Sequence, residues 1–265
     1  MVDFEFKSVY NFYDLVNIMS ILRSPDGCPW DREQTHKSIR RDFLEECYEA
    51  IEAIDTDDRE LLREELGDVL LQVVFHAQIE AEVNGFTADD VCNDICQKLI
   101  IRHPHVFGDV SAEDSETVLK NWDAIKMQTK SQKTHSEVMH SVSPALPALI
   151  RADKIQGKAK KIGFDFPDAN AALDKLSEEI AELKSAMQNG NKYEIESELG
   201  DVLFSAVNVG RLLKIDSEKA LSDTSERFIS RFEGIEKLCN ERDIDINSLS
   251  LTELDKLWEE VKASN

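Results

Sequence analysis

Apolar residues recur every three or four positions over most of this chain, and that spacing is typical of one face of an α-helix. Three long segments show the pattern clearly, at 61–83, 171–187 and 193–213. Few residues interrupt such segments, because the 265 residues include only 10 glycines and 6 prolines. The pattern therefore predicts an all-α protein.

The sequence also marks where these helices begin and end. Asp57 and Glu60 stand where an N-cap residue and its capping-box partner are expected before the first segment. Asn84-Gly85 and Asn189-Gly190 follow the first and second segments. Glycine readily adopts the left-handed conformation that ends many helices, so both pairs are predicted helix stops.

One short sequence, ELGDVL, occurs twice, at 65–70 and at 198–203, which is a separation of 133 residues. The motifs EECYE at 45–49 and EEIAE at 178–182 have the same separation. Two motifs at one offset indicate an internal duplication. We therefore expect two tandem helical-bundle modules, 8–127 and 148–263, joined by a polar linker at 128–147 that contains two prolines.

The charge of the chain limits its partners, because 53 acidic and 31 basic residues give a formal net charge of −22. Such a chain should repel nucleic-acid backbones, which recruit lysine and arginine, so no nucleic-acid partner is expected. No apolar run is long enough to span a bilayer, and the first residues lack an apolar signal region. Five cysteines without a CxxC pair are typical of reduced thiols. We expect a cytoplasmic protein that does not bind membranes.

Closely spaced acids are the most informative polar residues. Glu45, Glu46 and Glu49 are three or four positions apart and project from one side of a predicted helix. Glu65 and Asp68 share a face of the next helix in the same way. Two antiparallel helices would bring these acids together, and such a cluster needs a neutralising charge. Oxygen ligands suit Mg²⁺ or Mn²⁺, and a metal held this way can bind a polyphosphate.

The second module repeats the acids, and this repetition favours a site over an ordinary solvated helix face. A duplicated core would need its apolar positions in both copies, but it would have no reason to keep acids beside them. Gly67, within the first ELGD, costs about 1 kcal/mol relative to alanine inside a helix, so we expect it to allow a close approach by a neighbouring helix. The repeated acids are Glu178, Glu179, Glu182, Glu198 and Asp201.

Basic and aromatic residues at matched positions supply the second half of the predicted site. Each module has two basic residues four positions apart and, later, a tryptophan four positions before a lysine. Arginine and lysine suit phosphate contacts and tryptophan can stack on a base, although each residue alone is also compatible with a solvated face or a core position. The set comprises Lys98, Arg102, Trp122 and Lys126 in the first module, Arg227, Arg231, Trp258 and Lys262 in the second, and Lys158 in a basic run at 154–161.

EExxE followed by ExxD in a helical chain resembles the all-α nucleoside triphosphate pyrophosphohydrolases. The tandem arrangement, with GCPWDREQTH at 27–36, RHPHVFGDV at 102–110 and KIQGKAKKIGFDF at 154–166, is similar to the MazG family over about residues 8–262. The resemblance implies a bundle of four-helix type that forms a homodimer. It also implies Mg²⁺-dependent hydrolysis of canonical or non-canonical nucleoside triphosphates to monophosphate and diphosphate, a role in maintaining the nucleotide pool.

The resemblance also implies a role for each motif residue. The repeated acids of both modules would be metal ligands, and one glutamate of each cluster, Glu179 or Glu46, is the candidate general base. The basic residues would hold phosphates, and the tryptophans would contact the nucleotide.

Two other kinds of function stay open on the sequence. A non-catalytic nucleotide sensor or regulator would bind the Mg²⁺-nucleotide through the same residues and stop there. A purely structural helical dimeriser would have no affinity for metal. Turnover separates the enzyme from both alternatives.

Overall fold

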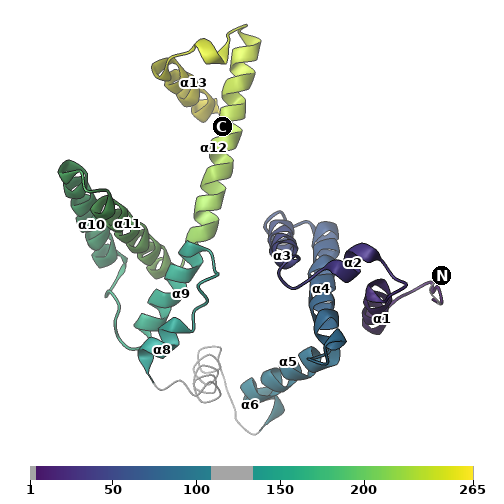
Figure 1. Ribbon diagram of the computed structural model, residues 1–265. Coiled ribbons are helices and arrows are strands. Elements are labelled where there is room, and N and C mark those ends of the chain that lie inside the picture. Colours follow the sequence, from purple (N-terminus) through teal and green to yellow (C-terminus); the bar gives the residue numbers. More distant parts are fainter. Residues whose placement is uncertain (1–3, 109–133, 265) are drawn as a thin grey trace. The chain divides into compact units, whose positions relative to one another are not determined.

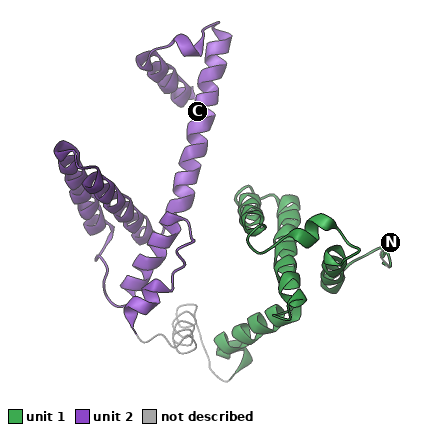
Figure 2. Ribbon diagram, viewed as in Figure 1, with its two compact units in different colours: residues 1–130 green, residues 131–265 purple. Residues whose placement is uncertain are grey.

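The computed structural model describes residues 4–108 and 134–264, and within these ranges the regular elements are helices, as predicted, without a strand. The chain divides into two compact units, residues 1–130 and 131–265 (Figure 2). The duplicated motifs fall one in each unit. Among the described residues, no helix combines the length and the apolar character needed to cross a membrane.

The first unit is organised around the packed pair α3 and α4, and α1 packs against α4 (Figure 1). Met19, Ile39, Val74 and Phe75 form its buried core. The helices of this unit are α1 (Phe12–Arg23), α2 (Pro29–Glu33), α3 (Arg40–Asp55), α4 (Arg59–Glu82), α5 (Ala88–Arg102) and α6 (Pro104–Phe107).

The predicted helix at 61–83 is observed as α4. Its observed N-terminus differs slightly from the predicted one. The N-cap is Asp58, whose carboxylate accepts hydrogen bonds from the backbone N–H groups of Glu60 and Leu61. The assignment of Asp57 as N-cap was wrong, because Asp57 has a φ of 54° and makes the turn before the cap. At the other end Asn84 has a φ of 57°, so the predicted stop is confirmed.

The second unit is organised around the packed pair α10 and α11, and α9 packs against α11. Gly190, with a φ of 73°, ends α10 as predicted. From the α9 end of this pair α12 leads away, and α13 folds back along it (Figure 1). Within the expected linker, α8 forms and packs against α9. The elements are α8 (His135–His140), α9 (Ala148–Lys160), α10 (Ala169–Asn189), α11 (Lys192–Leu212), α12 (Ser217–Glu241), η1 (Ile246–Ser248) and α13 (Leu251–Ser264).

The glycine of each ELGD motif lies on an open surface. A Cβ atom added at Gly67 or at Gly200 would meet no other atom within 4 Å. The expectation that Gly67 admits a neighbouring helix is therefore wrong within one chain. The side chains of Leu66, next to Gly67 in sequence, and of Leu70, three positions after it, are exposed as well.

Two histidines connect the segment before α3 to α4. Nδ1 of His36 lies 2.7 Å from Nδ1 of His76, and Nε2 of His36 lies 2.8 Å from a carboxylate oxygen of Glu80. The two imidazole rings stack with centroids 5.0 Å apart, and Phe43 contacts His76 edge-on. Burial, together with the adjacent His36 ring, lowers the pKa of His76 below its usual range.

This lowered pKa makes the stability of the first unit depend on pH through His76. A histidine whose pKa is lower in the folded than in the unfolded state contributes stability above its unfolded value of about 6.5, and that stability is lost as pH falls through the folded value. Calorimetry measures the melting temperatures of the wild type and of His76→Gln. The wild-type value minus the His76→Gln value should therefore be smaller at pH 5.5 than at pH 7.5. His140→Gln, at an exposed histidine, is the control. A difference that does not change with pH would contradict the prediction.

Candidate functional site

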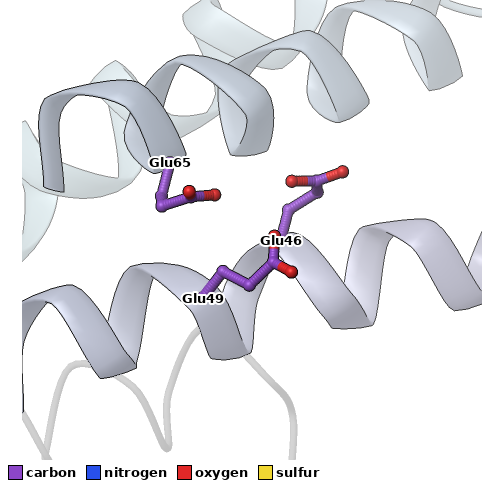
Figure 3. Close-up of side chains that lie close together, drawn as sticks. All are labelled: Glu46, Glu49 and Glu65. Atoms are coloured by element: carbon purple, nitrogen blue, oxygen red, sulfur yellow. The ribbon is translucent and has the colours of Figure 1, made fainter. Parts of the chain in front are cut away.

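Three carboxylates of the first unit converge between α3 and α4. Glu46 and Glu49 project from α3 and Glu65 projects from α4 (Figure 3). Each side chain offers one oxygen, and these three oxygens lie within 4.8 Å of one another. Glu65 is only 9% exposed, so its negative charge lies in a poorly hydrated position.

Burial and the proximity of other acids raise the pKa values of two of these carboxyl groups, those of Glu65 and Glu46. Burial, and then repulsion from Glu49, raises the pKa of Glu65. Burial, and then repulsion from Asp68, raises the pKa of Glu46, to which Asp42 also contributes. Both effects disfavour the charged forms, and a bound cation would reverse them.

Helix geometry explains why one predicted acid lies outside this group. Ala50 and Ala53 are buried against α4, and they share a face with Glu46 and Glu49 because these residues are spaced i, i+3, i+4 and i+7. Glu45 is off that face. Its carboxylate accepts a hydrogen bond from Nε of Arg41 at 2.8 Å and is half exposed.

The second unit forms the matching group from Glu179 and Glu182 on α10 and Glu198 on α11. One oxygen from each again lies within 4.8 Å of the others. Glu179 is 7% exposed. Burial, and then a hydrogen bond with Glu179, raises the pKa of Glu182. Asp201, one turn beyond Glu198, lines a cavity together with Glu179.

A lysine that the sequence reasoning missed distinguishes the second site. Nζ of Lys175 lies 2.8 Å from Glu179 and 3.0 Å from Glu178, and these hydrogen bonds raise the pKa of Lys175. Glu178, whose side chain is 58% exposed, lies outside the three-carboxylate group, whereas the buried Glu179 belongs to the group although it contacts the same lysine. At the offset of 133 residues the first module has Asp42, so this position carries opposite charges in the two copies. The offset alone could have revealed the difference.

The predicted basic and aromatic residues of the second unit form a separate cluster on α12 and α13. The guanidinium of Arg231 lies 5.5 Å from the centroid of the Trp258 ring, which also contacts Phe228. Arg227 donates a hydrogen bond to Thr224 on its own helix, and Lys262 faces Glu259 at 3.4 Å. Within one chain, α13 lies away from α10 and α11 (Figure 1). The single chain therefore does not bring these residues to the carboxylates.

In the first unit, too, the predicted basic residues lie away from the carboxylate group. Glu65 lies near the start of α4, about 25 Å along the helix axis from the end where α5 begins. Lys98 and Arg102 lie on α5, which leads away from α3 (Figure 1). Lys158 of the second unit is half-buried on α9. Trp122 and Lys126 lie outside the described residues.

A partly buried ion pair joins α11 to the segment that precedes α10 in the second unit. The guanidinium of Arg211 on α11 bonds both carboxylate oxygens of Asp165, and the Nη1–Oδ2 distance is 3.2 Å. Nε of Arg211 also donates to the side-chain oxygen of Asn208 at 3.0 Å. Fixing Asp165 in this way positions the loop between α9 and α10, which includes Phe164 and Phe166.

The chemistry of the two carboxylate groups fits a hard divalent cation. All donors are carboxylate oxygens at close spacing, which suits Mg²⁺ or Mn²⁺ rather than a thiolate- or imidazole-binding metal. Burial and neighbouring acids raise the pKa values of Glu46, Glu65 and Glu182, and a bound cation would favour the charged forms of these groups.

Comparisons with known proteins match this duplicated arrangement. The family described as MazG nucleotide pyrophosphohydrolase domain matches twice, at residues 34–107 and 168–235. The Thermotoga maritima protein named nucleoside triphosphate pyrophosphohydrolase/pyrophosphatase MazG is 45% identical over 254 residues, which cover 96% of each chain. The Escherichia coli K12 protein named nucleoside triphosphate pyrophosphohydrolase is 41% identical over 251 residues, which cover 94% of this chain and 95% of the relative.

A longer relative contains the same region. The uncharacterized protein YabN of Bacillus subtilis is 45% identical over 260 residues, which cover 97% of this chain and 53% of that protein. The two family matches include the helix pairs α3–α4 and α10–α11, and with them both carboxylate groups. This chain therefore belongs to the MazG family and contains two tandem copies of its all-α domain.

Proposed function

We propose that this chain is a cytoplasmic enzyme that hydrolyses nucleoside triphosphates to nucleoside monophosphate and diphosphate with Mg²⁺, or with Mn²⁺ in its place. The observation that carries the proposal is the three-carboxylate group that recurs between both helix pairs. The names of the Thermotoga and Escherichia relatives support the reaction. The substrates would be canonical and non-canonical ribo- and deoxyribonucleotides, and the role would be maintenance of the nucleotide pool.

The acids have two tasks in this proposal. Glu179, Glu182 and Glu198, with Asp201 beside them, would hold the cation, which when bound would neutralise the carboxylates and the triphosphate. Glu179 accepts the proton of the water that attacks the α-phosphorus, and Glu46 has this task in the first unit. In-line attack forms the new P–O bond and breaks the bond between the α-phosphorus and its bridging oxygen, so diphosphate leaves.

A homodimer would supply the second half of each site. Arg227, Arg231 and Lys262 lie away from the carboxylates of their own chain, so a second copy is the natural source of these phosphate-binding residues. Trp258 would approach the nucleotide from the same copy. Light scattering of the full chain measures this expectation directly, because it should give the mass of two copies.

The exposed surface of the helix pairs supports this assembly. Large apolar side chains remain at least one-third exposed on both pairs, and such faces commonly mark subunit interfaces. The open glycines Gly67 and Gly200 lie on these helices, where the absence of a side chain allows another backbone to approach. The exposed side chains include Leu44, Ile51, Leu66 and Leu70 on α3 and α4, and Leu173, Ile180, Leu199 and Leu203 on α10 and α11.

Product analysis tests the reaction. The full chain is incubated with a panel of nucleoside triphosphates in Mg²⁺ or in EDTA, and the products are separated by ion exchange. We expect monophosphate and diphosphate, with Mg²⁺ only. Nucleoside diphosphate with inorganic phosphate would overturn the proposed site of attack. Stoichiometric binding without turnover would favour the nucleotide sensor.

A further inference from the structure

The two carboxylate groups have matching acids, but one position beside them carries opposite charges in the two units. Asp42 of α3 and Lys175 of α10 are 133 residues apart, which is the offset of the duplication. Asp42 is four positions before Glu46, and Lys175 is four positions before Glu179. Residues four apart are neighbours on a helix, so each charge lies next to the first glutamate of its group.

In the second unit, Lys175 supplies a positive charge to the carboxylate group. Its Nζ lies 2.8 Å from Oε1 of the buried Glu179 and 3.0 Å from Oε1 of Glu178. The ammonium is therefore bound directly to one of the three closely spaced acids. A divalent cation that binds this group has to compete with a positive charge that the protein already holds there.

In the first unit, the corresponding position adds a negative charge. Asp42 is half-buried and adds to the repulsion that Glu46 experiences from other acids. Within the described residues, no basic side chain forms an ion pair with Glu46, Glu49 or Glu65. A divalent cation that binds this group meets an additional acid and no competing ammonium.

The difference between the two groups is large in electrostatic terms. Exchanging lysine for aspartate changes the local charge by two units within one helical turn of the acids. Coulomb interactions at such short range are strong where hydration is poor, and Glu65 and Glu179 are both buried. The same ligand set should therefore bind a cation more strongly in the first unit than in the second.

We propose that Lys175 competes with the divalent cation for Glu179, and that in the absence of nucleotide the first carboxylate group binds Mg²⁺ or Mn²⁺ more tightly than the second. The inference rests on the proposed function, because it concerns the cation of the same two groups. It makes the units unequal, since the first is occupied by a cation at concentrations that leave the second empty.

Manganese binding to the full chain without nucleotide tests the inference, because free hydrated Mn²⁺ is measured directly by electron paramagnetic resonance. The wild type should bind one Mn²⁺ tightly and a second at least about tenfold more weakly. Glu65→Gln should remove the tight binding, and Glu198→Gln should remove the weak binding. This readout does not depend on hydrolysis, so a chain without turnover would leave the inference standing.

Exchanging the two charges should reverse the order of the affinities. In a chain that carries Glu65→Gln, Lys175→Asp should tighten the remaining Mn²⁺ binding about tenfold. Lys175→Gln, which removes the charge without reversing it, should give a smaller change in the same direction. In a chain that carries Glu198→Gln, Asp42→Lys should weaken the remaining binding about tenfold.

The matched control is Lys184→Asp, which makes the same charge change at an exposed position of α10. Lys184 is nine positions after Lys175, about two and a half turns along the helix, and so projects from the opposite side. It should leave Mn²⁺ affinity unchanged. Equal affinities of the two groups in the wild type would overturn the inference, and so would an unchanged second affinity in both Lys175 variants. Absence of Mn²⁺ binding from both groups would overturn the cation sites of the proposed function as well.

Discussion

The double variant Glu65→Gln with Glu198→Gln is expected to hydrolyse nucleotides at least about 100-fold more slowly than Glu65→Gln alone. The amide keeps the shape of the side chain but removes one of the three closely spaced charges that would hold the cation. Loss of an outer partner of a metal ligand typically lowers metal affinity or activity 10- to 100-fold, so loss of a ligand should cost no less. Steady-state rates with Mg²⁺ measure the effect.

Unfolding can be excluded as the cause of that loss. Glu198 repels Glu182, whose pKa is raised by burial and by neighbouring acids, so a neutral replacement of Glu198 relieves repulsion and should not lower the melting temperature in EDTA. Glu196→Gln, at an exposed position on α11, is the matched control and should retain full activity. Undiminished Mg²⁺-dependent turnover in the double variant would show that these carboxylates are not the site.

Asp165→Asn is expected to lower the free energy of unfolding of the second unit by about 3 kcal/mol. The substitution leaves the guanidinium of Arg211, 9% exposed, without its counter-charge. Removing one partner of a buried pair is more destabilising than removing both, because the remaining charge is still desolvated. Urea unfolding followed by circular dichroism gives the free energy, and hydrogen exchange in α9 and α11 localises the loss.

Two further variants are needed to interpret the free energy of unfolding of Asp165→Asn. Asp174→Asn changes an exposed aspartate of α10 and should have little effect. The double variant Asp165→Asn with Arg211→Met should be less destabilised than Asp165→Asn alone. If the single and double variants were equally stable, the ion pair would not contribute as proposed.

The sequence by itself determined the features that depend on local periodicity. Apolar spacing predicted the all-α class, and the repeated offset predicted two related modules. The spacing of the acids identified one helix face in each motif, because residues three and four apart are neighbours on a helix whatever surrounds it. The buried alanines Ala50, Ala53 and Ala186 lie on the same faces and could have narrowed the choice of acids further.

Tertiary structure decided what depends on the packing of distant segments. It left Glu45 and Glu178 outside the carboxylate groups, because each lies off the helix face that the grouped acids occupy, and each pairs there with a basic residue of its own helix. It separated the basic residues of α12 from the acids, since that separation depends on the direction of a long helix. It also left a cavity in the second unit, which Asn208 lines, and buried the matching Phe75 in the core of the first unit. Helix periodicity fixes which face a residue occupies, but only packing fixes what that face meets.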